Sequence, residues 1–295
     1  TSIGEATGFE TYSPDDEGAL LEVCARTTSA FPASVTITSD FGNVPIPKGY
    51  KQALVSEHAS YWRDAISKEI GGLVALRTWD LVLLASLPPG ANVMHCHFIF
   101  TVKRNADGSV DKFKARLVAN GNTQKYGIDF DRIFSTVVKP STLRLLLVIA
   151  AALDCTLWQI DIRQAYLQAE LSSNLYMRVP PSISAYNKEG KPLVCKLRRS
   201  LYGLKQAGRE WATLFTAFLL EWGFTRSTID VCLFTFSEKA GKAYLWGAIY
   251  VDDAGLLDNS RVLRERFLTG LAARFPTDDR GELKWLLGVE VRRNR

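Results

Sequence analysis

Two adjacent carboxylates, Asp252 and Asp253, lie between apolar runs at residues 244–251 and 254–257. Runs of this length and composition predict two buried strands joined by a tight turn that carries both acids. Burying two neighbouring carboxylates without a counter-charge costs several kcal/mol. A bound divalent cation would keep both acids ionised and supply the missing positive charge. Because Asp–Asp pairs also occur in surface turns, the pair alone leaves both interpretations open.

A third carboxylate, Asp161, lies in a second apolar stretch far upstream, at residues 158–162. Two-metal phosphoryl transfer uses ions about 3.5–4 Å apart, and shared carboxylates must bridge them. Two distant strands that each deliver acid to one point would meet that requirement. The sequence therefore predicts that Asp161 joins Asp252 and Asp253 at one cation site.

Four short boxes of the chain, in order, resemble one enzyme family. Tyr-Val-Asp-Asp at residues 250–253 resembles the Y-x-D-D box of reverse transcriptases, and Asp-Ile-Arg-Gln-Ala-Tyr-Leu at 161–167 resembles the D-V-[KR]-x-A-[FY]-L box of copia-type (Ty1/copia) retrotransposon enzymes. Ser-Leu-Tyr-Gly-Leu-Lys-Gln-Ala at 200–207 is similar to that group's S-L-Y-G-L-K-Q-A signature, and Lys-Ala-Arg-Leu-Val-Ala at 114–119 is a fourth match. The resemblance runs from about Tyr61 to Val291.

This resemblance implies an α+β fold: the fingers and palm of a right-hand polymerase, with a ferredoxin-like antiparallel palm sheet backed by helices. Residues 47–295 would form the reverse transcriptase domain. Its fingers would span about 47–140 and its palm about 141–295, with a fingers insertion near 172–205. We expect residues 1–46 to be a largely disordered leader with a short helix near 18–26. A thumb and a ribonuclease H domain are expected to be absent from this chain.

The implied activity is RNA-directed DNA polymerisation, in which a primer is extended on an RNA or DNA template. By resemblance, Asp161, Asp252 and Asp253 are the catalytic residues and hold two Mg²⁺ ions, with Mn²⁺ as a possible substitute. The backbone carbonyl of Ile162 would be an added metal ligand. Three acids together with substrate phosphates suit the octahedral oxygen coordination of Mg²⁺.

The resemblance also implies substrate-binding residues. Tyr166 would stack under the sugar and exclude a 2′-hydroxyl, although a core aromatic is the alternative. Tyr202 and Gly203 would line the nucleotide pocket, where glycine lets the backbone approach closely, although a strand-to-helix turn explains them equally. Basic residues of a fingers hairpin would reach the nucleotide phosphates, unless they only form a charged solvent face: Lys103, Lys112, Lys114 and Arg116.

Composition places the chain among ordinary globular proteins, because 47% of its 295 residues are hydrophobic and 23% are charged. No run approaches the ~18–20 apolar residues of a membrane span. The net charge of +5 is concentrated: residues 103–144 hold nine Lys or Arg against four acids, and residues 188–209 hold seven against one. These stretches suit a phosphate-lined groove, although a solvated basic surface is the alternative.

We therefore expect as partners an RNA or DNA template, a DNA primer and deoxynucleoside triphosphates, and no membrane. Ribonuclease H and integrase domains of a polyprotein are expected neighbours that this chain lacks. The five cysteines have no CxxC spacing, which favours a reducing, intracellular location. The resemblance implies that this location is a cytoplasmic virus-like particle or the nucleus. We interpret His95-Cys96-His97 as the start of a strand.

Hydrophobic periodicity and turn residues predict the elements that must position these side chains. The predicted helices span residues 51–76, 141–153 with Ser141 or Thr142 as its cap, 163–171, 207–222 and 260–275. The predicted strands span residues 78–82, 97–104, 109–119, 155–162, 194–197, 231–237, 243–251 and 254–257. A hairpin over 283–291 resembles the one that grips a primer end.

Two other functions stay open. The chain could be a catalytically silent relic or nucleic-acid-binding subunit with the same fold, and Asn122 and Gly208 depart from the group's usual aromatic and proline. It could also be another two-metal enzyme, a nuclease or phosphatase. A polymerase needs primer, template and nucleotide together, so primer extension separates these possibilities.

Overall fold

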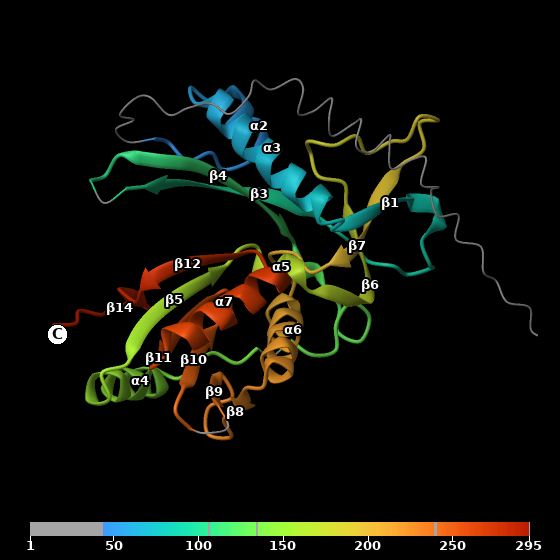
Figure 1. Cartoon of the computed structure of the whole chain (residues 1–295). Helices are drawn as coiled ribbons and strands as arrows, with labels where there is room; N and C mark the ends of the chain where they lie inside the picture. Colours follow the sequence, from blue (N-terminus) through green and yellow to red (C-terminus); the bar gives the residue numbers. More distant parts are fainter. Residues whose placement is uncertain (1–43, 106, 134, 239–240, 295) are drawn as a thin grey trace, which may run out of the picture. The chain divides into compact units, whose positions relative to one another are not determined.

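The computed structural model describes residues 44–105, 107–133, 135–238 and 241–294. Apart from residues 44–46, the leader predicted over 1–46 and its short helix lie outside the described residues. The chain forms two compact units, which are treated separately below (Figure 1). The first unit holds the described residues up to Asp131 together with Glu170–Ala207, and the second holds Arg132–Ala169 and Gly208 onwards. Of the helices described, none is long and apolar enough to cross a membrane.

The first unit is built on a long hairpin of β3 (Cys96–Arg104) and β4 (Val110–Ala119), as the sequence predicted. Helix α3 (Ala59–Ala75) packs on one face, where the ring of Trp62 meets those of Phe100 and Phe113 at centroid distances of 5.2 and 4.7 Å. The helix predicted over residues 51–76 is interrupted, because α2 (Tyr50–Val55) ends before α3 begins. The beginning of β3 at Cys96 confirms the strand predicted there.

A four-stranded sheet completes the first unit. Its order is β1 (Trp79–Leu83), β7 (Leu193–Arg199), β6 (Glu170–Arg178) and β2 (Val93–Met94), with only β2 and β6 running parallel. The helix predicted over residues 163–171 is wrong beyond α5 (Ala165–Gln168), since β6 begins at Glu170. Glu170 pairs with Arg199 of β7, so strand pairing overrides the local helix propensity there.

The second unit contains a six-stranded sheet in which every neighbouring pair is antiparallel. Its order is β12 (Thr277–Glu282), β5 (Thr156–Ile162), β11 (Asp253–Asp258), β10 (Tyr244–Tyr250), β9 (Leu233–Ser237) and β8 (Thr225–Arg226). The edge strand β12 was not predicted, because its sequence Thr-Asp-Asp-Arg-Gly-Glu has no apolar alternation. The protein thus has a mixed α/β fold with several sheets.

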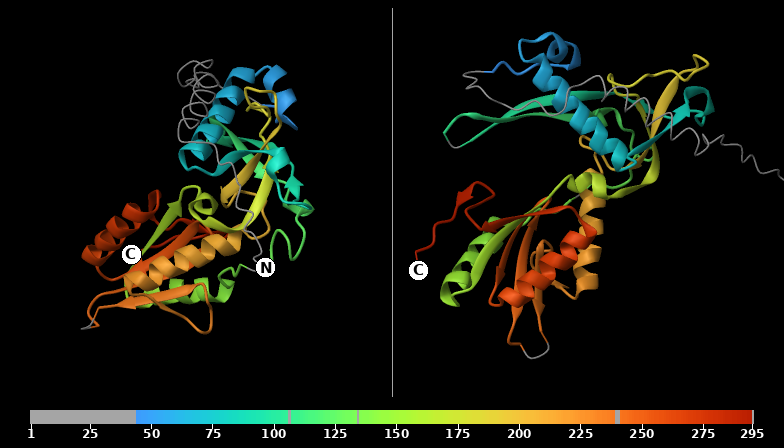
Figure 2. Two further views of the ribbon diagram at one scale, coloured as in Figure 1. Left: turned by 90° about the vertical axis from the view of Figure 1, so that its right-hand side faces the viewer. Right: turned by 45° about the horizontal axis from the view of Figure 1, so that its top comes forward.

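Helices cover both faces of this sheet (Figure 2). On one face, α6 (Ala207–Trp222) and α7 (Arg261–Arg274) contribute Phe215 and Phe267 to a core that includes Trp158 of β5. On the other face, α4 (Pro140–Ala152) and the hairpin of β13 (Trp285–Leu286) and β14 (Val289–Glu290) pack over Leu157 and Leu257. Both layers bury the apolar side chains that alternate along the strands.

The start of α4 differs from the prediction that Ser141 or Thr142 caps it. The helix begins with Pro140, and its N-cap residue Lys139 makes no side-chain capping bond. The hydroxyl of Thr142 instead donates to Asp230 Oδ2 at 2.5 Å. Proline has no backbone N–H. At the first helical position it therefore leaves one fewer N–H group that needs a capping partner. Asp230 therefore ties the start of α4 to the loop before β9.

Candidate active site

The paired acids lie on a two-residue turn between β10 and β11. Tyr250 and Asp253 are opposite each other in the ladder, so Val251 and Asp252 form the turn. Val251 has a φ of 55°, a conformation that β-branched residues rarely adopt. Residues held in such conformations persist only where their surroundings enforce them, and they gather at functional sites.

Two hydrogen bonds from neighbouring elements hold this turn. The indole Nε1 of Trp211 in α6 donates to the carbonyl oxygen of Val251 at 2.6 Å. The backbone N–H of Ile162 in β5 donates to the carbonyl oxygen of Asp252 at 2.9 Å. The peptide groups on both sides of Asp252 are therefore attached to the rest of the unit.

Strand pairing places the third predicted acid, Asp161, beside Asp252 and Asp253. Asp161 of β5 lies directly opposite Asp253 of β11. On its other side, β5 pairs with β12, and Asp278 lies opposite Asp161. The predicted acids thus meet at one end of the sheet, and Asp278 is a further carboxylate beside them.

Burial and like charge act together on Asp253. Burial raises the pKa of its carboxyl group, and the negative charges of Asp252 and Asp161 raise it further. The amide Nε2 of Gln159, which donates to Asp253 Oδ1 at 3.3 Å, and the guanidinium of Arg280 oppose this rise only in part. Because strand pairing brings Asp161 opposite Asp253 and the turn places Asp252 next to it, the acids are close enough to repel one another.

Arg280 is a residue of this site that the sequence did not reveal. Its Nη2 lies 2.5 Å from Asp161 Oδ2 and 3.8 Å from Asp278 Oδ2. The hydrogen bond to Asp161 raises the pKa of this guanidinium. Arg163 also reaches Asp278, with 3.5 Å between Nε and Oδ1. No local pattern signals Arg280, because only the pairing of β12 with β5 places it beside the acids.

Tyr166 of α5 is brought to the same end of the sheet. Burial raises the pKa of its phenol, and the charge of Asp252 and the neighbouring Tyr250 add to this effect. The ring is half-buried and packs at the border of the core formed by β5, α6 and α7. The second unit therefore gathers all five of its predicted site residues: Asp161, Ile162, Tyr166, Asp252 and Asp253.

The donor set determines whether a metal ion would fit. Within the described part of the chain, no group of three or more His, Cys, Asp or Glu side chains is arranged to hold a metal ion. Carboxylate oxygens are nevertheless the ligands that Mg²⁺ and Mn²⁺ prefer, and a cation would relieve the repulsion that raises the pKa of Asp253. The acids therefore fit a divalent ion by chemistry, while in this arrangement Arg280 supplies the counter-charge of Asp161.

In the first unit, the four predicted basic residues share one face of the β3–β4 hairpin. Lys103 lies opposite Lys112, and Lys114 and Arg116 follow at alternate positions along β4. Alternation places them on the face away from Phe113 and α3. Partial burial lowers the pKa of Lys114, and the charges of Arg116, Lys103 and Lys112 lower it further. We call these four residues the basic face.

Tyr202 and Gly203 lie beside the end of β4, also in the first unit. The guanidinium carbon of Arg116 is 5.6 Å from the centre of the Tyr202 ring, within the range of a cation–π contact. Gly203 has a φ of +89°, and a Cβ there would lie 2.2 Å from the carbonyl oxygen of Ala119. The close backbone approach that demands glycine is therefore made by the chain's own strand β4. A nucleotide-binding role for both residues stays a prediction.

Comparison with known proteins shows which family the chain is similar to. The family described as "Reverse transcriptase (RNA-dependent DNA polymerase)" matches residues 76–295. The chain is 38% identical over 247 residues to "Retrovirus-related Pol polyprotein from transposon RE1" of Arabidopsis thaliana, covering 84% of this chain and 16% of that protein. It is 37% identical over 232 residues to the corresponding RE2 protein of the same plant, covering 79% and 16%.

A third relative comes from another plant. The chain is 33% identical over 249 residues to "Retrovirus-related Pol polyprotein from transposon TNT 1-94" of Nicotiana tabacum, covering 84% of this chain and 18% of that protein. The chain thus spans less than a fifth of the length of the polyproteins that it matches. These relatives confirm the resemblance to copia-type retrotransposon enzymes. From residue 76 onwards the match is continuous, and the chain belongs to the reverse transcriptase (RNA-dependent DNA polymerase) family.

Proposed function

We propose that the chain is an RNA-directed DNA polymerase that extends a primer on an RNA or DNA template by two-metal nucleotidyl transfer. The observation that carries this proposal is the pairing of Asp161 with Asp253, next to the turn that holds Asp252. In this proposal the second unit is the palm of a right-hand polymerase, and the first unit is its fingers. An antiparallel sheet backed by helices, with the acids at one end, supports the palm assignment.

The acids would hold two Mg²⁺ ions, or Mn²⁺ in their place, with the Ile162 carbonyl as an added ligand. Such ions lower the pKa of an attacking hydroxyl and neutralise charge on a leaving pyrophosphate. Asp161, Asp252 and Asp253 orient this chemistry because β5, β11 and the tethered turn fix their backbones. Arg280 pairs with Asp161 Oδ2, so it would compete with a metal ion for that oxygen.

Tyr166 would select the sugar of the nucleotide. Its half-buried ring lies close enough to Asp252 for the acid's charge to raise the phenol pKa. An aromatic ring next to the catalytic carboxylates leaves little room for a 2′-hydroxyl, so discrimination would be steric. Such a site discriminates between ribonucleotide and deoxynucleotide by binding their transition states with different strength. The ratio of the two kcat/KM values measures this difference.

The basic face would bind phosphate. Partial burial lowers the pKa of Lys114, and repulsion by Arg116, Lys103 and Lys112 lowers it further. A polyanion such as a nucleoside triphosphate or a nucleic-acid backbone would relieve this repulsion. In the proposal Tyr202, which contacts Arg116, and Gly203 line the nucleotide pocket together with this face.

The partners in this proposal are a template, a DNA primer and deoxynucleoside triphosphates, with other domains of a polyprotein, in an intracellular setting. One observation favours a second candidate, a catalytically silent nucleic-acid-binding subunit. The ion pair between Arg280 and Asp161 neutralises an acid that polymerisation requires. Because Arg280 is exposed and its pair is open to solvent, a divalent ion can compete with it, so we favour the enzyme.

Primer extension tests the proposal. The chain is incubated with a 5′-labelled DNA primer on an RNA template, and separately on a DNA template, with Mg²⁺ and the four deoxynucleotides. We expect extension that requires nucleotide, template and metal together. Shortening of the primer without nucleotides would show a nuclease. Tight binding of the primer–template with no extension in either Mg²⁺ or Mn²⁺ would show the silent subunit.

A further inference from the structure

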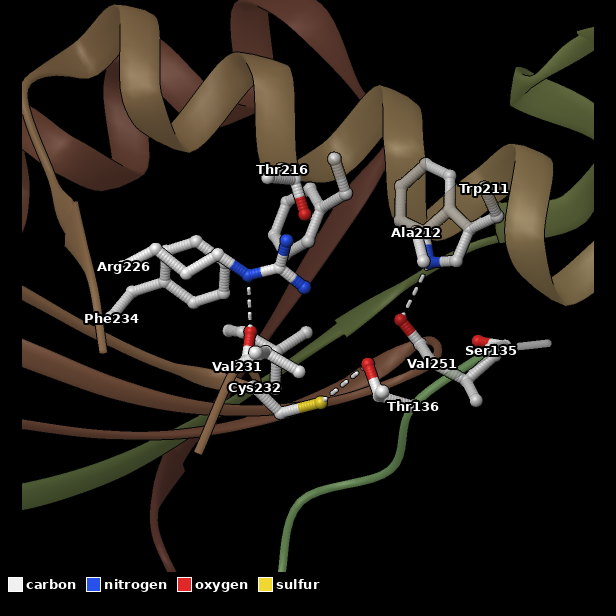
Figure 3. Close-up of a pocket in the computed structure, with 12 residues that line it drawn as sticks. Ser135, Thr136, Trp211, Ala212, Thr216, Arg226, Val231, Cys232, Phe234 and Val251 are labelled. Carbon is white, nitrogen blue, oxygen red and sulfur yellow. Dashed lines mark hydrogen bonds between the residues drawn. The ribbon is translucent and has the colours of Figure 1, made fainter. Parts of the chain in front are cut away.

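The side chain of Trp211 ties the turn that carries Asp252 to helix α6. The indole Nε1 of Trp211 donates to the carbonyl oxygen of Val251 at 2.6 Å, which Figure 3 shows as a dashed line. Trp211 belongs to α6 and is 1% exposed. The bond therefore joins two elements that are distant in the chain, and it does so where water is largely excluded.

This bond acts on the strained residue of the turn. Val251 has a φ of 55°, which its branched side chain disfavours. The carbonyl of Val251 belongs to the peptide group that leads into Asp252, so its direction helps set where Asp252 points. On the far side, Ile162 holds the carbonyl of Asp252. Without the indole, the peptide between Val251 and Asp252 would lose its side-chain tether.

Trp211 is itself firmly placed. Its ring stacks on Phe215 with a centroid distance of 5.1 Å and an interplanar angle of 15°. The ring of Phe275 meets it edge-on at 5.3 Å. Two aromatic contacts in different directions fix the plane of the indole, and with it the direction of the N–H. These contacts therefore orient the indole N–H independently of its hydrogen bond to the Val251 carbonyl.

Val251 also packs against the buried core to which Trp211 belongs. Trp211 and Val251 both line a pocket, together with Ser135 and Thr136 (Figure 3). The hydrogen bond therefore restrains the Val251 carbonyl in addition to the packing of the Val251 side chain.

We propose that Trp211 is a positioning residue for the catalytic turn: its indole N–H fixes the strained Val251 peptide and so presents Asp252 to the metal and substrate. This inference rests on the proposed polymerase function. It goes beyond that function because it assigns a role to a buried residue that touches neither nucleotide nor metal. Trp211 acts through the turn alone.

The chain offers a matched control for the test. Trp158 is also 1% exposed and lies in the same core, but within the described residues its Nε1 has no hydrogen-bond partner. Trp211→Phe and Trp158→Phe therefore remove the same atoms from the same core. Only Trp211→Phe removes a hydrogen bond to the turn.

Steady-state primer extension gives the first measurement. We expect Trp211→Phe to lower kcat roughly 10- to 100-fold, because small misplacement of a catalytic group has effects of this size. Its KM for nucleotide and for primer–template should change less than about twofold. Trp158→Phe should keep kcat within about threefold of the wild type. Equal losses of kcat in the two variants would overturn the inference.

A second variant distinguishes the loss of the Trp211–Val251 hydrogen bond from a general loss of core packing. Val251→Gly relieves the strain, because glycine adopts a positive φ without steric cost. We expect Trp211→Phe/Val251→Gly to recover part of the lost kcat, a coupling that a double-mutant cycle measures. If Trp211→Phe alone fails to fold, restored folding in the double variant supports the tether, and continued failure to fold contradicts it.

Amide hydrogen exchange tests the inference without relying on catalysis. In Trp211→Phe, amides of residues 249–254 should exchange faster than in the wild type, and in Trp158→Phe they should not. Unchanged exchange in Trp211→Phe would overturn the inference even in an active enzyme. A wild-type chain that does not extend primers would contradict the proposed function, and the exchange comparison would still decide the role of Trp211.

Discussion

Asp161 and Asp253 lie directly opposite each other on the antiparallel strands β5 and β11. Asp278 of β12 faces Asp161 from the other side, so carboxylates of three neighbouring strands form a row. Side chains opposite each other in a ladder are about 4.5–5.5 Å apart at Cβ, and like charges at that distance destabilise the sheet. Repulsion within this row acts against the stability of this end of the sheet, and five predictions concern the row, the side chains beside it and the basic face.

Replacing the predicted catalytic acids should abolish extension without unfolding the protein. Asp161→Asn and Asp252→Asn each remove a charge that would hold a divalent ion, and we expect losses of at least ~10³-fold in kcat. Without metal, the unfolding free energy of Asp252→Asn should equal or exceed that of the wild type, because repulsion is relieved. Primer extension and urea unfolding measure the two effects. Near-normal extension by either variant would refute the assignment.

The raised pKa of Asp253 predicts a pH dependence of stability. The folded state holds this proton more tightly than the unfolded state, whose carboxyl group has the ordinary value of 3.8. Between pH 3.8 and the raised pKa, the folded state binds more protons than the unfolded state does. The contribution of Asp253 to the unfolding free energy therefore falls as pH rises through this window. Asp253→Asn should become increasingly stable relative to the wild type over that window.

Urea unfolding at a series of pH values, with a chelator present, measures this difference. Asp230→Asn is the control, because burial raises the pKa of Asp230 but hydrogen bonds from Thr142, Lys139 and Cys232 outweigh burial and lower it. Its stabilising contribution is present above the ordinary pKa and is lost as pH falls through the lowered value. The two variants should therefore differ from the wild type with opposite slopes. Parallel slopes would disprove the assigned direction for Asp253.

Removing Arg280 should strengthen metal binding. The guanidinium lies 2.5 Å from Asp161 Oδ2, so it competes with a divalent ion for that oxygen. Arg280→Gln should raise the affinity for Mn²⁺ about 1.4- to fivefold, which corresponds to the ~0.2–1 kcal/mol of an exposed ion pair. Isothermal titration of Mn²⁺ without substrates measures this directly. Arg292→Gln, which removes another exposed arginine that pairs with Glu290 at 2.8 Å, should leave the affinity unchanged; an equal rise there would point to a general charge effect.

Removing the Tyr166 ring should weaken sugar discrimination. Tyr166→Val opens space beside Asp252, so the ratio of kcat/KM for ribonucleotide to that for deoxynucleotide should rise about tenfold or more. Single-nucleotide incorporation with matched ribo- and deoxynucleotides gives this ratio. Tyr126→Val, at an exposed tyrosine of the first unit, serves as the control. An unchanged ratio in a folded Tyr166→Val enzyme would favour a core role for the ring.

Neutralising the basic face should weaken phosphate binding. Lys114→Gln removes a charge that its neighbours disfavour in the absence of an anion, and we expect KM for nucleotide to rise at least about tenfold, the size of a charge-assisted hydrogen bond. Lys68→Gln on α3 removes an exposed lysine that already pairs with Asp64, and KM should stay constant. Equal KM values for Lys114→Gln and the wild type would place the basic face outside nucleotide binding.

Local pattern determined much of this protein in advance. Helix α6 spans residues 207–222 as predicted, since an apolar face recurs at helical spacing and Gly223 follows it. The hairpin of β3 and β4 was predicted from two strand-like runs and the turn between them. Alternation along β4 was enough to put Lys112, Lys114 and Arg116 on one face. Asp252 and Asp253 stood out because acids rarely interrupt apolar runs.

Only the tertiary structure decided which distant groups meet at the site. Strand β12 has no apolar alternation, and its pairing with β5 alone brings Arg280 and Asp278 to Asp161. The bond from Trp211 to Val251 likewise joins a helix to a turn 40 residues away. Periodicity reports which face of an element is buried, because burial depends on local alternation of apolar and polar residues. It does not report which element comes to lie against that face, since chain topology and packing set those contacts.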